Sequence, residues 1–475
     1  MAEEKSNSIP PNEKSNETYI DKAVNLSPEG SEPSAKGLST YHEFANEEAQ
    51  QDEEISTAKF QNPLSGLSQE ELFADVDKFC RDNELAEYID VFRRGALVAQ
   101  NPKTAHELEE LTNEDKESLQ HEIDHKWSHP WALYNLVIMC SVAAAVQGMD
   151  ETVNNGAQQF YLEKFGIVSS KMDQSRVDNL TGLIVGAPYL ACATIGCWIT
   201  EPLNRFLGRR GTIFLTCFIA AVASIWEGVC NSWPNLLVAR LVLGLGIGPK
   251  SSTVPVYTAE CSPAPIRGAL VMMWQMWTAF GIMLGNIMGV AFGGLDKDLG
   301  WRLMLGSTVV LPLIVCAEVF FCPESPRWLI EKNKIAKAFR SFQVLRGSDL
   351  KASRDLYYAW KLVELERKAN HGKYLWNMAW ELFSVPRNAR ATLASFIVMF
   401  LQQFCGVNII AYYSTAIFQQ SGFSMSSALL ASMGIGLHPG GVRFAFGISS
   451  VYLPMEIQGD TSNKIIRCSH HGFRN

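Results

Sequence analysis

The sequence lacks most of the residue patterns that catalysis and metal binding require. Its eleven cysteines show no metal-ligand spacing, and several, such as Cys192 and Cys217, lie in apolar stretches where a thiol packs as a small hydrophobic group. No nucleophile with a nearby base and no glycine-rich phosphate loop occurs in the 475 residues. We therefore expect neither an enzyme nor a bound metal or cofactor.

Long apolar runs are absent before Trp131, so no cleavable signal peptide is expected. The net charge of −8 comes largely from acidic residues in this polar region, which argues against nucleic-acid binding. Residues 1–60 are rich in Ser, Asn, Glu and Pro, a composition that predicts a disordered cytosolic tail.

Residues 61–126 show a helical pattern instead. Ser68 and Glu71 have the spacing of a capping box, and Leu72, Val76 and Phe79 follow at the spacing of one helix face. We predict a cytosolic extension of two or three short helices. It either leads into the first membrane span or binds a partner.

Apolar segments of membrane-spanning length fill much of the remaining chain, each close to the ~20 residues that cross a bilayer. The pattern predicts an all-α membrane protein with an eighth span beginning near Ala428 and seven spans before it, at residues 131–158, 181–198, 212–229, 236–257, 270–292, 303–321 and 393–413.

Basic residues lie in every second loop between these segments. Arg209 and Arg210 follow the second span, Arg267 follows the fourth, and a Lys- and Arg-rich stretch follows the sixth. Because cytosolic loops carry an excess of Lys and Arg, the N-terminus and the long loop are predicted to be cytosolic. This orientation argues against a seven-helix receptor, whose N-terminus would be extracellular.

The fourth apolar segment carries the most informative motif, which begins at Arg240 and ends at Arg267-Gly268. A bare charge inside an apolar helix is costly, so Arg240 is a functional candidate. Gly244, Gly246 and Gly248 follow it, and small residues at this spacing let another helix approach closely.

The pattern R-x3-G-x-G-x-G…P-x-Y-x2-E…RG resembles the fourth helix of the sugar porter family in the major facilitator superfamily. The resemblance covers about residues 131–436, and the entry to the first span, HKWSHPWALY, looks like a fungal branch of that family. It implies a major facilitator fold with a complete N-terminal six-helix half and an incomplete C-terminal half. The expected divisions after the extension are a six-helix bundle at 131–322, a cytosolic loop with short helices at 323–391, a partial second bundle at 392–436 and an aberrant tail at 437–475.

The resemblance also implies a proton-coupling pair. GMDETVNNG in the first span is similar to the family's G-x-D…G signature, whose aspartate pairs with the arginine that opens the fourth helix. By that match, Asp150 accepts the proton and Arg240 is its partner. A solvated charge at the outer interface is the plainer reading of Asp150. Glu227 and Glu318 are further acids of the membrane region, to which the sequence assigns no role.

The seventh span, QQFCGVNIIAYYSTAIF, resembles the family's substrate-binding sequence. The match implies that Gln402, Gln403 and Asn408 bind sugar hydroxyls, since side-chain amides both donate and accept hydrogen bonds. Tyr412 and Tyr413 would close the outer gate. Gln275 in the fifth span matches a family glutamine that faces the same cavity. Phe404-Cys405 replaces the family's usual Leu-Ser, so the substrate could be a sugar, a polyol, inositol or an acid. Interhelical hydrogen bonding is the plainer role for these amides.

Charged residues at the cytosolic ends match a third family feature, a charge lock that closes the inner face. PESPRWL and LNRFLGRRG carry its residues, although Arg205 stands where the family has an acid and Glu201 is a candidate substitute. The matched lock residues are Arg209, Arg210, Glu260, Arg267, Glu324 and Arg327.

The resemblance implies transport of a sugar or polyol with protons by a multi-pass protein of the lipid bilayer, expected in the plasma membrane. The apolar pattern ends at His438-Pro439, and a mis-spliced or out-of-frame tail would explain the abrupt change. Without the later helices we expect the 475-residue chain not to transport by itself. A sugar sensor, which would bind its ligand without accumulating it, is the alternative.

Overall fold

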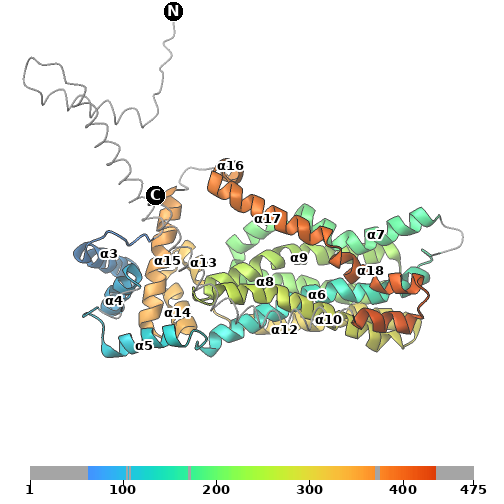
Figure 1. Cartoon of the computed structure of the whole chain (residues 1–475), viewed down its shortest axis with the longest axis horizontal. Helices are drawn as coiled ribbons and strands as arrows, with labels where there is room; N and C mark the ends of the chain where they lie inside the picture. Colours follow the sequence, from blue (N-terminus) through green and yellow to red (C-terminus); the bar gives the residue numbers. More distant parts are fainter. Residues whose placement is uncertain (1–61, 103–104, 106–107, 169–172, 370–374, 435–475) are drawn as a thin grey trace, which may run out of the picture. The chain divides into compact units, whose positions relative to one another are not determined.

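Every regular element in the computed structural model is a helix within the residues it describes, which are 62–102, 105, 108–168, 173–369 and 375–434 (Figure 1). The predicted tails at 1–60 and 437–475 lie outside these ranges. The chain divides into a unit that ends at Gly66 and a unit from Leu67 onward, and all the helices discussed below belong to the second.

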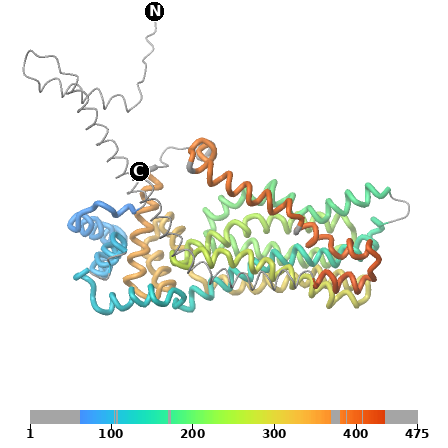
Figure 2. The backbone as a smooth tube through the Cα atoms, in the orientation of Figure 1, coloured from blue at the N-terminus to red at the C-terminus, as the bar shows by residue number. Residues whose placement is uncertain are grey.

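The first-half spans form a series of long helices that Figure 2 shows as neighbouring tubes. Their bounds are α6 Trp131–Lys164, α7 Gln174–Ala191, α8 Cys197–Val229, α9 Trp233–Cys261, α10 Arg267–Gly293, α11 Lys297–Ser307 and α12 Val310–Glu318. A π-turn at Cys192–Gly196 joins α7 to α8, and a short 3₁₀ turn, Val319–Phe321, follows α12.

Five helical stretches among the described residues are long and apolar enough to cross a membrane: Trp131–Lys164, Gln174–Val229, Arg267–Gly293, Lys297–Phe321 and Asn388–Gln420. The second of them turns at Gly208, where φ is 77°, so it supplies two of the predicted spans. The helix α9 carries Arg240, Lys250 and Glu260 and is not among the five. The predicted six helices of the first half are thus all present.

Glycines allow the close helix packing that the motif predicted. A Cβ on Gly244 would lie 2.1 Å from the carbonyl oxygen of Pro188 in α7, and one on Gly248 would lie 2.8 Å from the backbone of Gly196. The contact of α6 with α10 is equally close, since a Cβ on Gly148 would lie 2.0 Å from the oxygen of Thr278. Backbones at this distance exclude any larger side chain.

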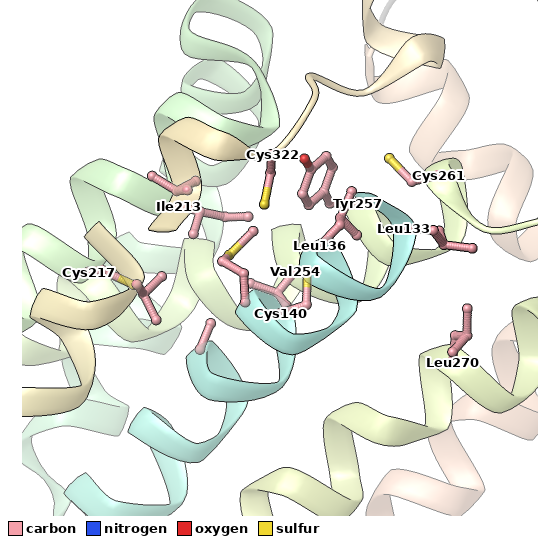
Figure 3. Packing of buried hydrophobic residues seen from close by; sticks show 14 of the residues in the cluster. Leu133, Leu136, Cys140, Ile213, Cys217, Val254, Tyr257, Cys261, Leu270 and Cys322 are labelled. Atoms are coloured by element: carbon pink, nitrogen blue, oxygen red, sulfur yellow. The ribbon is translucent and has the colours of Figure 1, made fainter. Parts of the chain in front are cut away.

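A core of buried apolar residues joins α6, α8, α9 and α10 (Figure 3). Leu136 and Cys140 of α6 lie beside Cys217 of α8 and Tyr257 of α9, all at least 95% buried. The Tyr257 hydroxyl donates to the carbonyl of Pro323 just after the sixth span. Cysteine acts here as a packing residue, as the sequence predicted.

The predicted cytosolic extension contains three helices, α3 Gln69–Asp82, α4 Ile89–Gln100 and α5 Asn113–Asp124, with a 3₁₀ turn at Ala86–Tyr88. The capping box is confirmed, because the Ser68 hydroxyl accepts from the backbone N–H of Glu71 and the Glu71 carboxylate accepts from that of Ser68. Leu72, Val76 and Phe79 are buried as expected.

The loop that the sequence predicts to be cytosolic also folds into helices: α13 Pro326–Glu331, α14 Ile335–Arg346, α15 Asp349–Ala369 and α16 Leu375–Ser384. The extension packs on α15. Tyr357 donates to Asp75 at 2.5 Å, Lys361 pairs with Asp75 at 2.7 Å, and Arg354 pairs with Glu122 at 3.0 Å. These contacts hold the extension against α15.

The seventh predicted span consists of two helices, α17 Pro386–Phe404 and α18 Val407–Gln420. The predicted span at 393–413 lies within the apolar stretch Asn388–Gln420, and Gly406, in a left-handed conformation with φ 75°, divides this stretch into the two helices. A short apolar helix, Met425–Gly434, corresponds to the start of the predicted eighth span.

Candidate functional site

Asp150 lies inside the first bundle on α6. Its side chain is 7% exposed, and its Oδ2 atom has no hydrogen-bond partner among the described residues. Glu151 follows it and accepts a hydrogen bond of 3.3 Å from Gln147. A buried carboxylate without a donor is costly in its charged form, so Asp150 is suited to taking up a proton.

Arg240 is 3% exposed on α9 and is held by three groups. It donates to the carbonyl of Ile184 at 2.8 Å and to Oδ1 of Asn154 at 3.2 Å, and it forms an ion pair of 3.6 Å with Glu227. The predicted direct pair with Asp150 is not formed, because Glu227 reaches the guanidinium from α8. No partner for Glu227 could be predicted from the sequence, since Glu227 and Arg240 come from different helices.

Lys250 is a second buried cation that the sequence reasoning missed. It is fully buried on α9, ten residues after Arg240, and its ammonium group has no hydrogen-bond partner in the described part of the chain. The signal that identified Arg240, a bare charge in an apolar helix, applies equally to Lys250.

A small cavity is lined by both Asp150 and Arg240. Its lining combines polar side chains of α6, α7, α9 and α18 with four apolar ones; the residues are Asp150, Glu151, Tyr189, Arg240, Tyr412, Val185, Pro188, Leu243 and Ile247. Asp150 and Arg240 thus face one space without touching. Such a cavity offers water and a proton a place beside the carboxylate.

Three of the predicted substrate residues surround the break between α17 and α18. Gln402 and Gln403 are exposed at the end of α17, and Asn408 donates to Oε1 of Gln403 at 2.9 Å across the break. The break therefore holds two of the amides against each other. Gln275 is exposed on α10, and no hydrogen bond joins it to this group among the described residues.

Of the predicted gate residues, Tyr412 contacts the first bundle. Its hydroxyl lies 2.7 Å from that of Tyr189 on α7. Tyr413 is partly buried beside it. The same helix is held to α6 by Asn155, which donates to Ser414 at 2.7 Å and accepts from the backbone N–H of Thr415 at 3.1 Å.

Where α8 and α9 approach the loop after the sixth span, Arg209 and Glu260 form a buried bidentate ion pair. The Nη2–Oε1 distance is 2.8 Å, the Nε–Oε2 distance is 3.0 Å, and the side chains are 13% and 9% exposed. Ser325 also donates to Glu260 at 2.6 Å. Two adjacent helices and the loop after the sixth span are thereby tied together.

Glu324 completes this cluster through backbone groups. It accepts from the N–H groups of Arg209, Arg210 and Ser325 at 3.1, 3.3 and 2.9 Å. The turn at Gly208, beside the Glu324 carboxylate, requires glycine because its φ of 77° is strained for any other residue. Burial raises the pKa of Glu324, and these N–H donors oppose the shift.

The other predicted lock residues lie outside the ion pair. Arg210 donates to the carbonyls of Val319 and Phe320, Arg267 donates to that of Ser262, and Arg327 pairs with Glu366 at 2.7 Å. Arg205 and Glu201 are both exposed and form no ion pair in the described region, so Glu201 does not replace the expected acid. No cluster of metal-binding side chains occurs in the residues that the structure describes.

Comparison with known proteins decides the family. The family model described as "Sugar (and other) transporter" matches residues 136–453, which is more than half of the chain. The chain belongs to this sugar transporter family. The match runs past residue 436, which corrects the expectation that the resemblance ends there.

Individual relatives of the chain agree with the family. It is 30% identical over 303 residues to a myo-inositol transporter of Gibberella moniliformis, covering 63% of this chain and 50% of the relative. It is 34% identical over 261 residues to the human proton myo-inositol cotransporter (54% and 40%) and 30% over 330 residues to polyol transporter 5 of Arabidopsis thaliana (66% and 58%). The chain therefore spans about half the length of the curated relatives it matches.

Solved structures confirm the major facilitator fold. The proton:xylose symporter XylE bound to 6-bromo-6-deoxy-D-glucose superposes with a TM-score of 0.56 at 22% identity, covering 68% of this chain and 69% of that one. A partially occluded inward-open form of the xylose transporter XylE from E. coli gives 0.52, with 65% and 71% covered. At this identity the likeness concerns the fold alone.

Proposed function

We propose that this sugar transporter moves a sugar or polyol across a membrane together with protons, by alternating access. The observation that carries the proposal is Asp150, a buried carboxylate with an unpaired oxygen beside a cavity that Arg240 and Tyr412 also line. The relatives named for polyols and for proton-coupled myo-inositol transport support the substrate class.

Protonation of Asp150 is the coupling step in this proposal. The charged layer around it holds three carboxylates, those of Asp150, Glu151 and Glu227, against the cations of Arg240 and Lys250. One bound proton makes the layer neutral. Because a net charge is costly inside a bundle, loading and release of that proton bias the protein between two arrangements.

Substrate binding is assigned to the amides of Gln275, Gln402, Gln403 and Asn408. The hydrogen bond from Asn408 to Gln403 shows that these two groups can satisfy each other without ligand. A sugar hydroxyl can replace that bond on both sides, since it donates and accepts. Polyols and inositol present the same groups.

Gating is assigned to the two faces of the bundle. Tyr412 with Tyr413 closes the outer side against Tyr189, and the cytosolic charge lock of Arg209, Arg210, Glu260, Arg267, Glu324 and Arg327 closes the inner side. The Arg209–Glu260 pair joins α8 to α9 and, through Ser325, to the loop after the sixth span, so it holds these helix ends together on the inner side. The proposed location is the plasma membrane with a cytosolic N-terminus, as the distribution of basic residues predicts.

The test is uptake of labelled myo-inositol, polyols and hexoses by cells that lack their own carriers. Two proteins are expressed, the 475-residue chain and the product encoded by the sequenced transcript of the gene. The rise in external pH is recorded as the sign of proton uptake. Asp150→Asn should abolish concentrative uptake, while Asp178→Asn, a matched change at an exposed position, should not. Sugar binding without accumulation would indicate a sensor instead and refute the proposal.

A further inference from the structure

Two buried groups of opposite charge remain unsatisfied in the first bundle. Lys250 of α9 is fully buried with no partner for its Nζ atom, and Asp150 of α6 has none for Oδ2, within the described residues. Burying a single unpaired charge is strongly unfavourable. Two such charges in contacting helices call for a common explanation.

The helices α6 and α9 meet at these residues. Ser251, which follows Lys250, donates to Oε1 of Gln147 at 2.7 Å, and Gln147 lies three residues before Asp150. One turn of α9 therefore packs on the turn of α6 that ends at Asp150. Gly248 contacts the backbone of Gly196, so this part of α9 is enclosed on another side as well.

Arg240 is less available to Asp150 than Lys250. Glu227 already pairs with Arg240, and Asn154 and the Ile184 carbonyl take its other donors. The ammonium group of Lys250, by contrast, has no hydrogen-bond partner among the described residues.

The remaining titratable neighbours do not supply another free cation. The helix α10 packs closely on α6 and has no charged side chain beyond Arg267 at its start. Glu151 lies next to Asp150 on α6. The titratable groups around Asp150 on the other helices are Tyr189 on α7, Cys217 and Glu227 on α8, Arg240 and Lys250 on α9, and Tyr412 on α18.

We propose that Lys250 is the counter-charge of Asp150 and the positioning residue that controls its protonation. The inference rests on the proposed proton coupling and adds a residue to it. When Asp150 is ionised, Lys250 neutralises it. When Asp150 takes a proton from the cavity, the layer as a whole becomes neutral but Lys250 loses this nearby anion, which favours an arrangement of α6 and α9 in which the ammonium meets another acceptor or water.

A stability cycle on the purified 475-residue protein tests the pair without sugar. Lys250→Met and Asp150→Asn should each lower the melting temperature, because each leaves one buried charge alone. The double variant should recover most of that loss. Lys337→Met, at an exposed cytosolic position, is the matched control and should melt like the parent. Purely additive losses in the double variant would overturn the proposal.

Infrared difference spectra give a readout that a merely structural role would not change. The carbonyl band of protonated Asp150 is identified by its loss in Asp150→Asn. Across a pH series this band should persist to higher pH in Lys250→Met than in the parent, since the compensating cation is gone. An unchanged band would refute the role of Lys250.

These outcomes are separate from those of the transport assay. Coupling in the cycle and in the spectra, with no uptake, would leave the Lys250 assignment standing and remove the proposed function. Proton-driven uptake that survives Lys250→Met unchanged would leave the proposed function standing and remove the Lys250 assignment.

Discussion

Removing the charge of Glu260 should destabilise the protein more than removing any exposed carboxylate. The Glu260 side chain is 9% exposed and accepts three hydrogen bonds, two from Arg209 and one from Ser325. In Glu260→Gln the shape is kept, but Arg209 loses its counter-ion in a buried part of the bundle. Breaking a buried pair by changing one partner costs about 3 kcal/mol or more.

The assay is thermal unfolding of the purified protein in detergent. At about 2 °C per kcal/mol, the value suited to larger domains, the expected loss is about 6 °C. The matched control is Glu163→Gln, which breaks a 3.1 Å pair with Lys297 whose side chains are 65% and 73% exposed. Exposed pairs contribute little, so that variant should melt like the parent. Equal melting temperatures for both variants would refute the reasoning, because burial would then have no bearing on the pair.

Two further predictions concern packing and pH. Gly244→Ala should lower the melting temperature, since the new Cβ would lie 2.1 Å from a carbonyl of α7, whereas Gly268→Ala, with nothing within 4 Å, should not. Burial would raise the pKa of Asp355, but the guanidinium groups of Arg354 and Arg346 hold it at about 2, below the usual 3.8. A depressed folded-state pKa adds stability above pH ~4 that is lost as the pH falls toward ~2, here about 2 kcal/mol. Asp355→Asn should remove that part of the acid sensitivity in melts recorded against pH; an unchanged profile would contradict it.

The sequence was sufficient to predict the helices of the first half and the family. Apolar runs of spanning length predicted all six helices of the first half, because a bilayer demands about the same length of each. The capping box at Ser68 and Glu71 was equally readable, since it is a local pattern. The glycines after Arg240 predicted close packing, and their contacts with α7 and α8 confirm it.

The pairing of charges could not be read in the same way. Glu227 and Arg240 are close in sequence but lie on opposite arms of a helical hairpin, and only the packing of α8 on α9 brings them together. The break at Gly406 was missed because QQFCGVNII is apolar enough to read as a continuous span. Lys250 was missed for a different reason: its signal was present in the sequence, and only its lack of a partner required the structure.

The contacts that hold α18 to the first bundle differ in kind from those inside the bundle. In the described residues, α6 and α7 meet α18 through neutral hydrogen bonds, from Asn155 to Ser414, from the Thr415 N–H to Asn155, and between the hydroxyls of Tyr189 and Tyr412. Each such bond contributes only about 1 kcal/mol net.

Inside the bundle, by contrast, Arg240 with Glu227 and Arg209 with Glu260 are buried ion pairs whose disruption is costly. An alternating carrier needs this difference, because its two halves must part and rejoin while each half keeps its own structure. The weaker interface is therefore the one expected to open. Asp150 lies close to this interface, because the cavity that it lines is also lined by Tyr412 of α18. A change in the charge of Asp150 can therefore act on the interface.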